Sequence, residues 1–544
     1  MRLTFTCNLG QSEKPLAAFF HGVLLPLVLG LGAFVSQLPF LPKYLQSWDA
    51  IQFALALEHF DIPMHRPHPP GYLAHIGISY LFSTLGFEND KCVMLASCLA
   101  SAMATIALYY LASVLDGKQV AMVASLLFMS HPYTLYLATS GETYPLEALG
   151  AILIALTFVS AQSKPDQDLR RVLFFFVLTA SGGIRQNLPL FFSPLAVFML
   201  VQSITRRRAK QVSYLILAGV IGLFTWLLPL FILSKDFGSV IHAFRHQFFS
   251  MYASAYSLIF GADIRAVLLN LGRLFTYLAG AITISGMFAV SIYISPYRPR
   301  LSRNTCLVAV VWLAPALLWF LLLFVAKPGH LFFWVPLFAL LEAKAFIATT
   351  SFLRKFLCLG AVASNFFLFL IPPLFYTAHI SGLSYPVLRY SDTLMDKAVS
   401  TVREAIKNDS ESAVVVTRDG FFSFRASMFY VPEVRTLWLR DWESTGILTG
   451  GVQVCEGRHR TEVCEPGPEF FPRSPWKDTA DVGLSPKTKI IFFALDEESS
   501  FYKMLEKSVT LNPISIGEAK VLHALWLPEG SFELRLGPYT FKRQ

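Results

Sequence analysis

The sequence predicts a helical, multi-pass membrane domain followed by a small soluble α/β domain. Of its 544 residues, 54% are hydrophobic and only 15% are charged, whereas roughly a quarter of a soluble protein is charged. Long apolar runs continue to about residue 377, and charged residues return after that point. We therefore expect an all-α membrane domain over residues 1–377 and a soluble α/β domain over residues 378–544.

About eleven apolar runs are expected to cross the membrane, although several are short and would need tight packing. The first follows Arg2 and Lys14 and has no small-residue cleavage pattern at its end, so it is expected to remain as an uncleaved span. The runs lie at Leu16–Phe40, Val93–Leu115, Val120–Ala138, Pro145–Ala161, Val172–Ile184, Leu188–Val201, Val212–Leu233, Ala266–Ile294, Leu307–Ala326, Leu331–Thr349 and Phe356–Tyr376.

The positions of the basic residues predict the orientation. Lys and Arg outnumber Asp and Glu by 45 to 36, and the basic residues cluster in short loops, which the positive-inside rule assigns to the cytoplasm. All the clusters fall on the cytoplasmic side of the membrane if residues 72–87 do not cross it. We therefore expect a first outer loop over residues 41–91. This distribution gives no indication of a nucleic-acid partner. The clusters are Lys118, Arg170–Arg171, Arg206–Lys210, Arg298–Arg303 and Arg354–Lys355.

The first outer loop has an unusual concentration of polar groups. We expect an amphipathic surface helix over Asp49–Phe60, because Trp48, Ile51 and Leu55 would share one apolar face. The prolines of P-H-P-P-G that follow, residues 67–71, impose a stiff backbone. The side chains of this loop are therefore expected to be held in place.

The tail has the pattern of a small α/β domain. Residues 391–407 have the periodicity of an amphipathic helix, and β-type runs lie at 413–417, 435–439, 489–495 and 521–527. Cys455 and Cys464 bracket a short segment; a disulfide is favoured over free thiols, and a zinc site is the least favoured alternative. The cysteines in or beside apolar runs are interpreted as packing residues: Cys92, Cys98, Cys306 and Cys358.

Two short motifs resemble a known group of enzymes. An acidic residue, Asp49, follows the first span, H-P-P-G-Y occupies residues 68–72, and S-G-E-T-Y-P-L-E-A-L occupies residues 140–149. Together they resemble the GT-C superfamily of integral-membrane glycosyltransferases, in particular the protein O-mannosyltransferase-like branch and its bacterial relatives. The resemblance implies transfer of a sugar, with inversion, from a polyprenyl-phosphate donor to a hydroxyl of a protein, glycan or lipid acceptor.

The resemblance also implies roles for the acidic residues. Asp49 matches the first-loop acid that orients or deprotonates the acceptor; the alternative is that it caps the surface helix. Glu142 and Tyr144 lie in the second matched loop, where Glu142 would bind the sugar or, with Asp49, a divalent cation. Alternatively, Glu142 and Glu147 only complement the dipole of the next helix.

Histidines are the next candidates. His68 matches the family's loop histidine and is expected at the site, with His65 a weaker candidate. Both lie in a proline-rich loop rather than on a helix face, so a metal-ligand geometry is not predicted for them. His131 precedes Pro132 inside an apolar run and is interpreted as a hydrogen-bonded interior histidine.

A phosphate leaving group needs fixed positive charge. The candidate donor-binding residues are ionisable side chains between or inside the apolar runs, where charge is costly and usually functional. Each of the cations has a simpler alternative, which is to extend toward lipid headgroups. The candidates are Arg185, Lys327, His330, Arg245 and Arg273.

Two other classes of protein remain as alternatives. A transporter or flippase would have a similar number of spans, but no internal repeat is evident. An inert lipid-binding assembly subunit would keep the architecture without needing Asp49. No Walker A, Gly-rich dinucleotide or H-E-x-x-H motif is present. The preferred location is a bacterial inner membrane, with the active site and the C-terminal domain in the periplasm.

Overall fold

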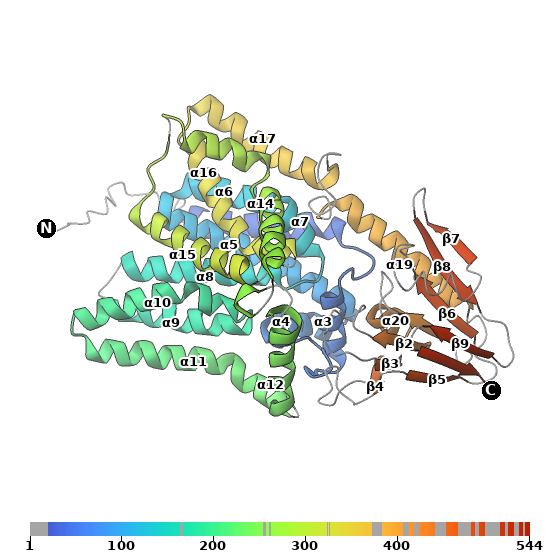
Figure 1. The fold of residues 1–544 in the computed structure, drawn as a ribbon. Coiled ribbons are helices and arrows are strands. Elements are labelled where there is room, and N and C mark those ends of the chain that lie inside the picture. Colours follow the sequence, from blue (N-terminus) through green and yellow to red (C-terminus); the bar gives the residue numbers. More distant parts are fainter. Residues whose placement is uncertain are drawn as a thin grey trace.

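The structure is a computed structural model, and it is drawn in Figure 1. It describes residues 20–543 except for 164–166, 235, 254–256, 261–262, 297, 324, 326, 373–382, 406–412, 418–423, 441–452, 466–479, 485–488, 495–511, 517–519, 527–531 and 537–538. The predicted domain boundary at residues 377 and 378 lies outside the described residues.

The membrane domain is a bundle of long apolar helices (Figure 1). Nine described helices are long and apolar enough to span a membrane, and a bent pair would make ten. The chain is therefore a multi-pass membrane protein. The helices of the domain, which include the bent pair α6 and α7 and the shorter helices α9 and α12 that are not candidate spans, are α2 (Leu25–Gln37, continuing from Phe20 to Phe40 through short π and 3₁₀ turns), α5 (Asn89–Asp116), α6 (Lys118–Ser130), α7 (Pro132–Thr139), α8 (Tyr144–Ser163), α9 (Asp168–Ala180), α10 (Asn187–Thr205), α11 (Ala209–Leu233), α12 (Phe237–Arg245), α14 (Ile264–Tyr293), α15 (Arg303–Leu322), α16 (Val335–Ile347) and α17 (Ser351–Leu370).

The difference from eleven predicted spans lies in α9. This helix coincides with the predicted run at 172–184, but it has 13 residues and is extended only by a 3₁₀ turn, Ser181–Gly183. The 72–87 segment forms α4 (Leu73–Thr84), whose 12 residues cover about 18 Å and are too short to cross a bilayer. The expectation that this segment does not cross is consistent with its length.

The bent pair is interrupted at His131. Helices α6 and α7 meet there at 57°, and the Nδ1 of His131 accepts a hydrogen bond from the backbone N–H of Tyr133, at 3.1 Å. Its Nε2 lies 3.1 Å from the carbonyl oxygen of Ala281. His131 is therefore a hydrogen-bonded interior histidine, as the sequence predicted.

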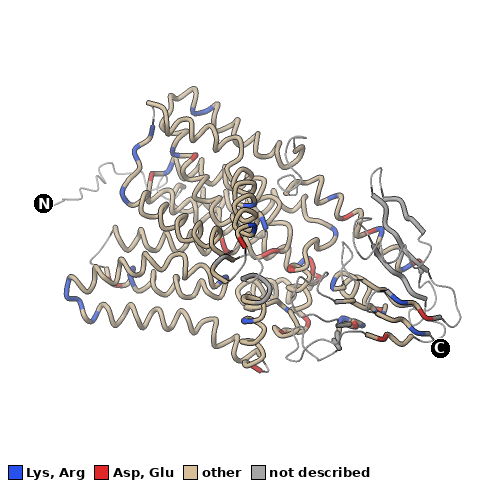
Figure 2. Tube along the Cα trace, in the orientation of Figure 1, with Lys and Arg blue, Asp and Glu red and all other residues tan. Residues whose placement is uncertain are grey.

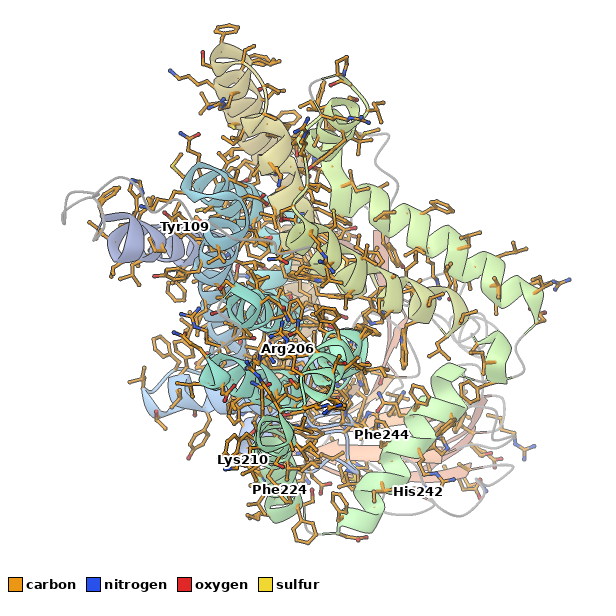
Figure 3. All side chains as sticks on the ribbon, turned by 90° about the vertical axis from the view of Figure 1, so that its left-hand side faces the viewer. Tyr109, Arg206, Lys210, Phe224, His242 and Phe244 are labelled. Atoms are coloured by element: carbon orange, nitrogen blue, oxygen red, sulfur yellow. The ribbon has the colours of Figure 1, made fainter. Side chains whose placement is uncertain are left out.

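The two ends of the bundle differ in charge. Figure 2 shows Lys and Arg gathered in the connections at the end of the bundle that faces away from the C-terminal domain. Arg206 and Lys210 lie at this end, which faces the viewer in Figure 3. The opposite end carries α4, the first outer loop and the C-terminal domain (Figure 1).

The C-terminal domain is α/β, as predicted. Helix α19 (Tyr385–Ala405) leads into it, and α20 (Phe424–Tyr430) packs on β2. The larger sheet has seven strands in the order β4-β3-β2-β1-β6-β8-β7, and a second sheet has the order β5-β10-β9. Each β-type run of the sequence became a strand. The strands are β1 (Ala413–Thr417), β2 (Arg435–Arg440), β3 (Gln453–Arg458), β4 (Thr461–Glu465), β5 (Ala480–Leu484), β6 (Lys489–Ala494), β7 (Asn512–Ile516), β8 (Lys520–Trp526), β9 (Phe532–Leu536) and β10 (Tyr539–Arg543).

The sheet explains the paired cysteines. Strands β3 and β4 form an antiparallel hairpin in which Cys455 lies directly opposite Cys464. Cys455 is disulfide-bonded, which agrees with the interpretation of the sequence. Cys92 and Cys98 are buried free thiols within α5.

The surface helix of the first outer loop is α3 (Trp48–Glu58). We expected one apolar face toward the membrane interface, but the structure buries every residue from Ala50 to Ala56, including Gln52. The reason is that α3 packs between α5 on one side and α20 on the other. The prediction of an amphipathic helix at the interface was therefore wrong, because two partners cover α3.

Candidate active site

A cavity of about 420 Å³ lies at the end of the bundle that carries the first outer loop. One part of its wall is polar, formed by side chains from the first turns of helices and from the connections between helices. The other part is aromatic, formed by residues from α12, α15 and the turn after α12. The polar wall consists of Asp49, His68, Glu147, Arg185, Asn187, Lys327 and His330, and the aromatic wall of Phe244, Phe248, Phe249, Trp319 and Phe320.

Asp49 lies in the first turn of α3. Ser47 caps this helix by accepting a hydrogen bond from the backbone of Ala50 at 3.0 Å, so Asp49 is not needed as the cap. Its Oδ2 lies 2.5 Å from Nζ of Lys327. Burial is the largest single influence on the pKa of Asp49 and would raise it, but the charge and hydrogen bond of Lys327, together with the nearby His68 and Arg185, outweigh burial and keep this pKa well below its usual range.

Lys327 connects the two predicted acids. Its Nζ lies 3.9 Å from Oε1 of Glu142 as well as 2.5 Å from Asp49. Burial raises the pKa of Glu142, partly opposed by Lys327. The loop of Glu142 approaches the first outer loop closely at Gly141, which has a φ of +76°; a Cβ there would lie only 3.0 Å from a side-chain carbon of Leu45. The two acidic loops are thus packed against each other.

His68 stands behind Asp49. Its Nδ1 lies 2.9 Å from Oε1 of Gln52 and 3.8 Å from Oδ1 of Asp49. Burial lowers the pKa of His68 to about 4, even though the nearby Asp49 carboxylate raises it. His68 is therefore neutral at physiological pH, and its ring can orient Gln52 and Asp49 but is a poor proton donor.

Arg185 is the second cation of the wall. Its NH1 donates to Oε2 of Glu147 at 2.6 Å, and Nδ2 of Asn187 donates to the other carboxylate oxygen at 2.8 Å. Its Cζ lies 5.0 Å from the ring centroid of Tyr144 and 5.9 Å from that of Tyr72. Glu147 thus holds Arg185 at the cavity instead of only complementing a helix dipole.

His330 lines the cavity between aromatic rings. Its ring centroid lies 6.1 Å from Tyr144 and 6.4 Å from the nearly parallel ring of Phe320. Gly329 allows this approach, since a Cβ at this position would lie 2.3 Å from a ring carbon of Tyr144. His330 therefore marks the boundary between the polar and the aromatic wall.

Of the ten candidate site residues, seven lie together at the cavity: Asp49, His68, Glu142, Tyr144, Arg185, Lys327 and His330. The other three lie elsewhere. His65 is buried in the first outer loop, with its ring centroid 6.5 Å from that of His68, but it does not line the cavity. Arg245 is exposed at the end of α12. The NH1 of Arg273 is 3.5 Å from the carbonyl oxygen of Val325.

The residues present do not fit a divalent cation between Asp49 and Glu142. The ammonium of Lys327 occupies the space between these carboxylates, at 2.5 and 3.9 Å. Within the described part of the chain, no group of at least three His, Cys, Asp or Glu side chains is arranged to bind a metal. We derive no step through a metal ion.

Several cavity residues had little or no signal in the sequence. Asn187 lies in the same polar interruption between two apolar runs as Arg185, so its position could have marked it as a candidate site residue. Trp319 belongs to an ordinary apolar run and Phe248 to the turn after α12, and both are recognisable only because the fold brings these parts of the chain to the cavity.

The comparisons with known proteins agree with this geometry. A family model described as dolichyl-phosphate-mannose-protein mannosyltransferase matches residues 67–231. This segment includes His68, Glu142 and Arg185 but neither Asp49 nor Lys327. No curated protein sequence matches the chain.

Solved structures share the fold at low sequence identity. ArnT from Cupriavidus metallidurans bound to undecaprenyl phosphate has a TM-score of 0.56 and 12% identity, over 93% of this chain and 98% of that chain. The apo form of ArnT has a TM-score of 0.53 and 13% identity, over the same shares of the two chains. AglB from Archaeoglobus fulgidus is an archaeal oligosaccharyltransferase, solved in complex with an inhibitory peptide and a dolichol-phosphate. It has a TM-score of only 0.38 and 12% identity, over 78% of this chain and 70% of that chain.

The chain shares the GT-C fold of ArnT. The family match, over residues 67–231, is of the mannosyltransferase type. The resemblance to the GT-C superfamily seen in the sequence is thereby confirmed.

Proposed function

We propose that this protein transfers a sugar from a polyprenyl-phosphate donor to a hydroxyl of a protein, glycan or lipid acceptor outside the cytoplasm. The observation that carries the proposal is the cavity itself, in which an ionised carboxylate and two cations face an aromatic wall. An amphiphile with an anionic head and an apolar chain matches such a wall. ArnT, which has the same fold, was solved with undecaprenyl phosphate.

In this proposal Asp49 is the general base. The acceptor oxygen attacks the anomeric carbon, the bond from that carbon to the phosphate oxygen breaks, and the hydroxyl proton passes to Asp49. A single displacement of this kind inverts the anomeric centre. The departing phosphate keeps the electron pair, and Arg185 and Lys327 stabilise its negative charge. Glu142, behind Lys327, sets the position of that ammonium.

The aromatic wall would hold the first isoprene units of the donor. Phe244, Phe248 and Trp319 offer a large apolar surface that requires little ordering on binding. A chain that lies there would keep the sugar-phosphate at the polar wall beside Arg185. The acceptor would arrive from the side of the C-terminal domain.

We also propose that the cavity and the C-terminal domain, residues 378–544, face the periplasm of a bacterial inner membrane. Support comes from the basic residues gathered at the other end of the bundle (Figure 2), which the positive-inside rule assigns to the cytoplasm. The residues of the cavity lie at the end with the first outer loop. This placement gives the acceptor access to the site from the outer side.

The proposal is tested with membranes that contain the protein and a panel of undecaprenyl-phosphate-linked radioactive sugars that includes mannose. Transfer and slow hydrolysis of the donor are both measured, so that an unidentified acceptor does not hide the activity. We expect Asp49→Asn to lower the rate at least about 100-fold, while Asp61→Asn in the same loop stays near wild type. An undiminished rate in Asp49→Asn would overturn the proposal.

A further inference from the structure

The first outer loop is attached to the C-terminal domain close to two of its cavity residues, Asp49 and His68. Trp48 directly precedes Asp49, and Arg66 lies two residues before His68. Each of these neighbours contacts the C-terminal domain. The domain therefore touches the chain just before Asp49 and again just before His68.

Trp48 is held by an aromatic and a cationic side chain. Its ring centroid lies 5.3 Å from that of Trp438 on β2, and Cζ of Arg425 on α20 lies 5.8 Å from it. Arg425 is fully buried and donates to the carbonyl oxygen of Met64 at 2.5 Å. Because Trp48 and Asp49 are adjacent in the first turn of α3, a shift of Trp48 also moves Asp49.

Arg66 forms the second attachment. It is only 4% exposed, and its NH1 donates to the carbonyl oxygen of Arg460, at the β3–β4 turn, over 2.6 Å. Backbone hydrogen bonds in both directions between Asp61 and Arg66 close the loop that leads to His68. The hairpin of the C-terminal domain therefore holds the start of the proline-rich segment.

The chain before α3 is attached to the same domain. The carboxylate of Asp392 on α19 accepts hydrogen bonds from the backbone of Lys43 and Tyr44, at 2.9 and 3.0 Å. The hydroxyl of Tyr430 accepts one from the backbone of Leu45, at 2.7 Å. Side chains of α3, α19 and α20 also form one continuous hydrophobic core. The attachment is therefore extensive.

We propose that the C-terminal domain positions the general base, with Trp438 and Arg425 as positioning residues that act through Trp48. The inference rests on the proposed function, because it assigns the base role to Asp49. Placement matters at this site because an error of about 1 Å in a catalytic group can cost about 100-fold in rate. Arg185 and the aromatic wall belong to other elements, so donor binding does not depend on this attachment.

The test compares Trp438→Ala with Trp438→Phe in the full-length protein in membranes, using turnover of undecaprenyl-phosphate-linked mannose or of whichever sugar of the panel the wild type uses. We expect kcat of Trp438→Ala to fall at least about 10-fold with KM for the donor unchanged. Trp438→Phe, which keeps a ring against Trp48, should restore most of kcat. Arg535→Ala, on an exposed strand of the small sheet, is the control and should match wild type.

A pH profile separates positioning from general loss of structure. Asp49 faces Lys327, Glu142, His68 and Arg185, and Lys327 is the main group that keeps it ionised. When Asp49 moves away from Lys327, its pKa rises, so the acid limb of kcat/KM should move to higher pH in Trp438→Ala. A merely smaller amount of folded protein would leave this limb in place.

The outcomes are distinguishable. If Asp49→Asn abolishes turnover while Trp438→Ala keeps the wild-type kcat and acid limb, the inference is overturned and the proposed function stands. If Asp49→Asn remains active, the proposed function is overturned, and the inference that rests on it is overturned as well. If Trp438→Ala does not fold, Trp438→Leu replaces it, because leucine keeps apolar volume without the ring. The same two measurements, kcat and the acid limb of kcat/KM, then decide.

Discussion

Both ends of the helical bundle bury charged side chains, but they differ in what those side chains surround among the described residues. At the end far from the C-terminal domain, Arg171 donates to Gln202, Ser203 and Gln211 at 2.8 to 3.1 Å, and Lys344 pairs with Asp116. None of these residues lines the cavity that Asp49, Arg185 and Lys327 surround. Buried charge alone is therefore a weak sign of function, and buried charge beside open space is a stronger one.

The largest effect is expected at the cavity end, from Lys327→Met. Removing this cation takes a fixed positive charge from the leaving phosphate, so kcat/KM should fall about 100-fold. Burial would then raise the pKa of Asp49, and because the base must be ionised, the remaining activity should be lost as pH falls through that higher pKa. A pH–rate profile measures both effects. Lys43→Met, at an exposed ion pair, is the control.

A smaller effect is expected from Arg185→Lys. The guanidinium binds Glu147 and lies against Tyr144, and an ammonium keeps the charge but loses the planar, forked geometry. We expect KM for the donor to rise about 10-fold with little change in kcat. Donor titrations in membranes measure this. An unchanged KM would place the donor phosphate away from Arg185.

The opposite end should respond in stability rather than activity. Lys344→Met leaves the carboxylate of Asp116 buried without its cation, which should cost about 3 kcal/mol. We expect a lower melting temperature in detergent but a normal kcat per folded molecule. Lys355→Met, an exposed cation on the neighbouring helix α17, should change neither quantity. A lost kcat in folded Lys344→Met would remove the contrast between the two ends.

The last effect, of the same size as that of Arg185→Lys, is expected from His68→Gln. Because the pKa of His68 is lowered to about 4, its ring is neutral from about pH 5 upward and adds no limb to the rate profile there. His68→Gln should lower kcat about 10-fold without changing the shape of the profile between pH 5 and 8. His59→Ala, with a side chain 52% exposed, is the matched control. A limb that disappears in His68→Gln would show that His68 titrates during turnover.

The sequence predicted most of the elements and much of the cavity wall. Its apolar runs became helices, and the motifs at 68–72 and 140–149 led to His68, Glu142 and Tyr144. The polar interruptions led to Arg185 and Lys327. Periodicity reports whether a face is apolar but not how many partners cover it, so the double burial of α3 was missed.

The candidate cations show a further limit. Arg185, Arg245 and Arg273 all stand in or between apolar runs, and no local pattern separates the one that lines the cavity from the two that do not. Their places depend on which helices meet in space. The same holds for Phe248, which follows the polar residues His246 and Gln247, and for Trp319, which lies inside an apolar run.

The most direct test is a structure of the protein in a lipid bilayer with undecaprenyl phosphate bound. We expect the phosphate within hydrogen-bond distance of Arg185 or Lys327 and the first isoprene units against Phe244, Phe248 and Trp319. A phosphate bound instead among the basic residues at the opposite end of the bundle would contradict this expectation.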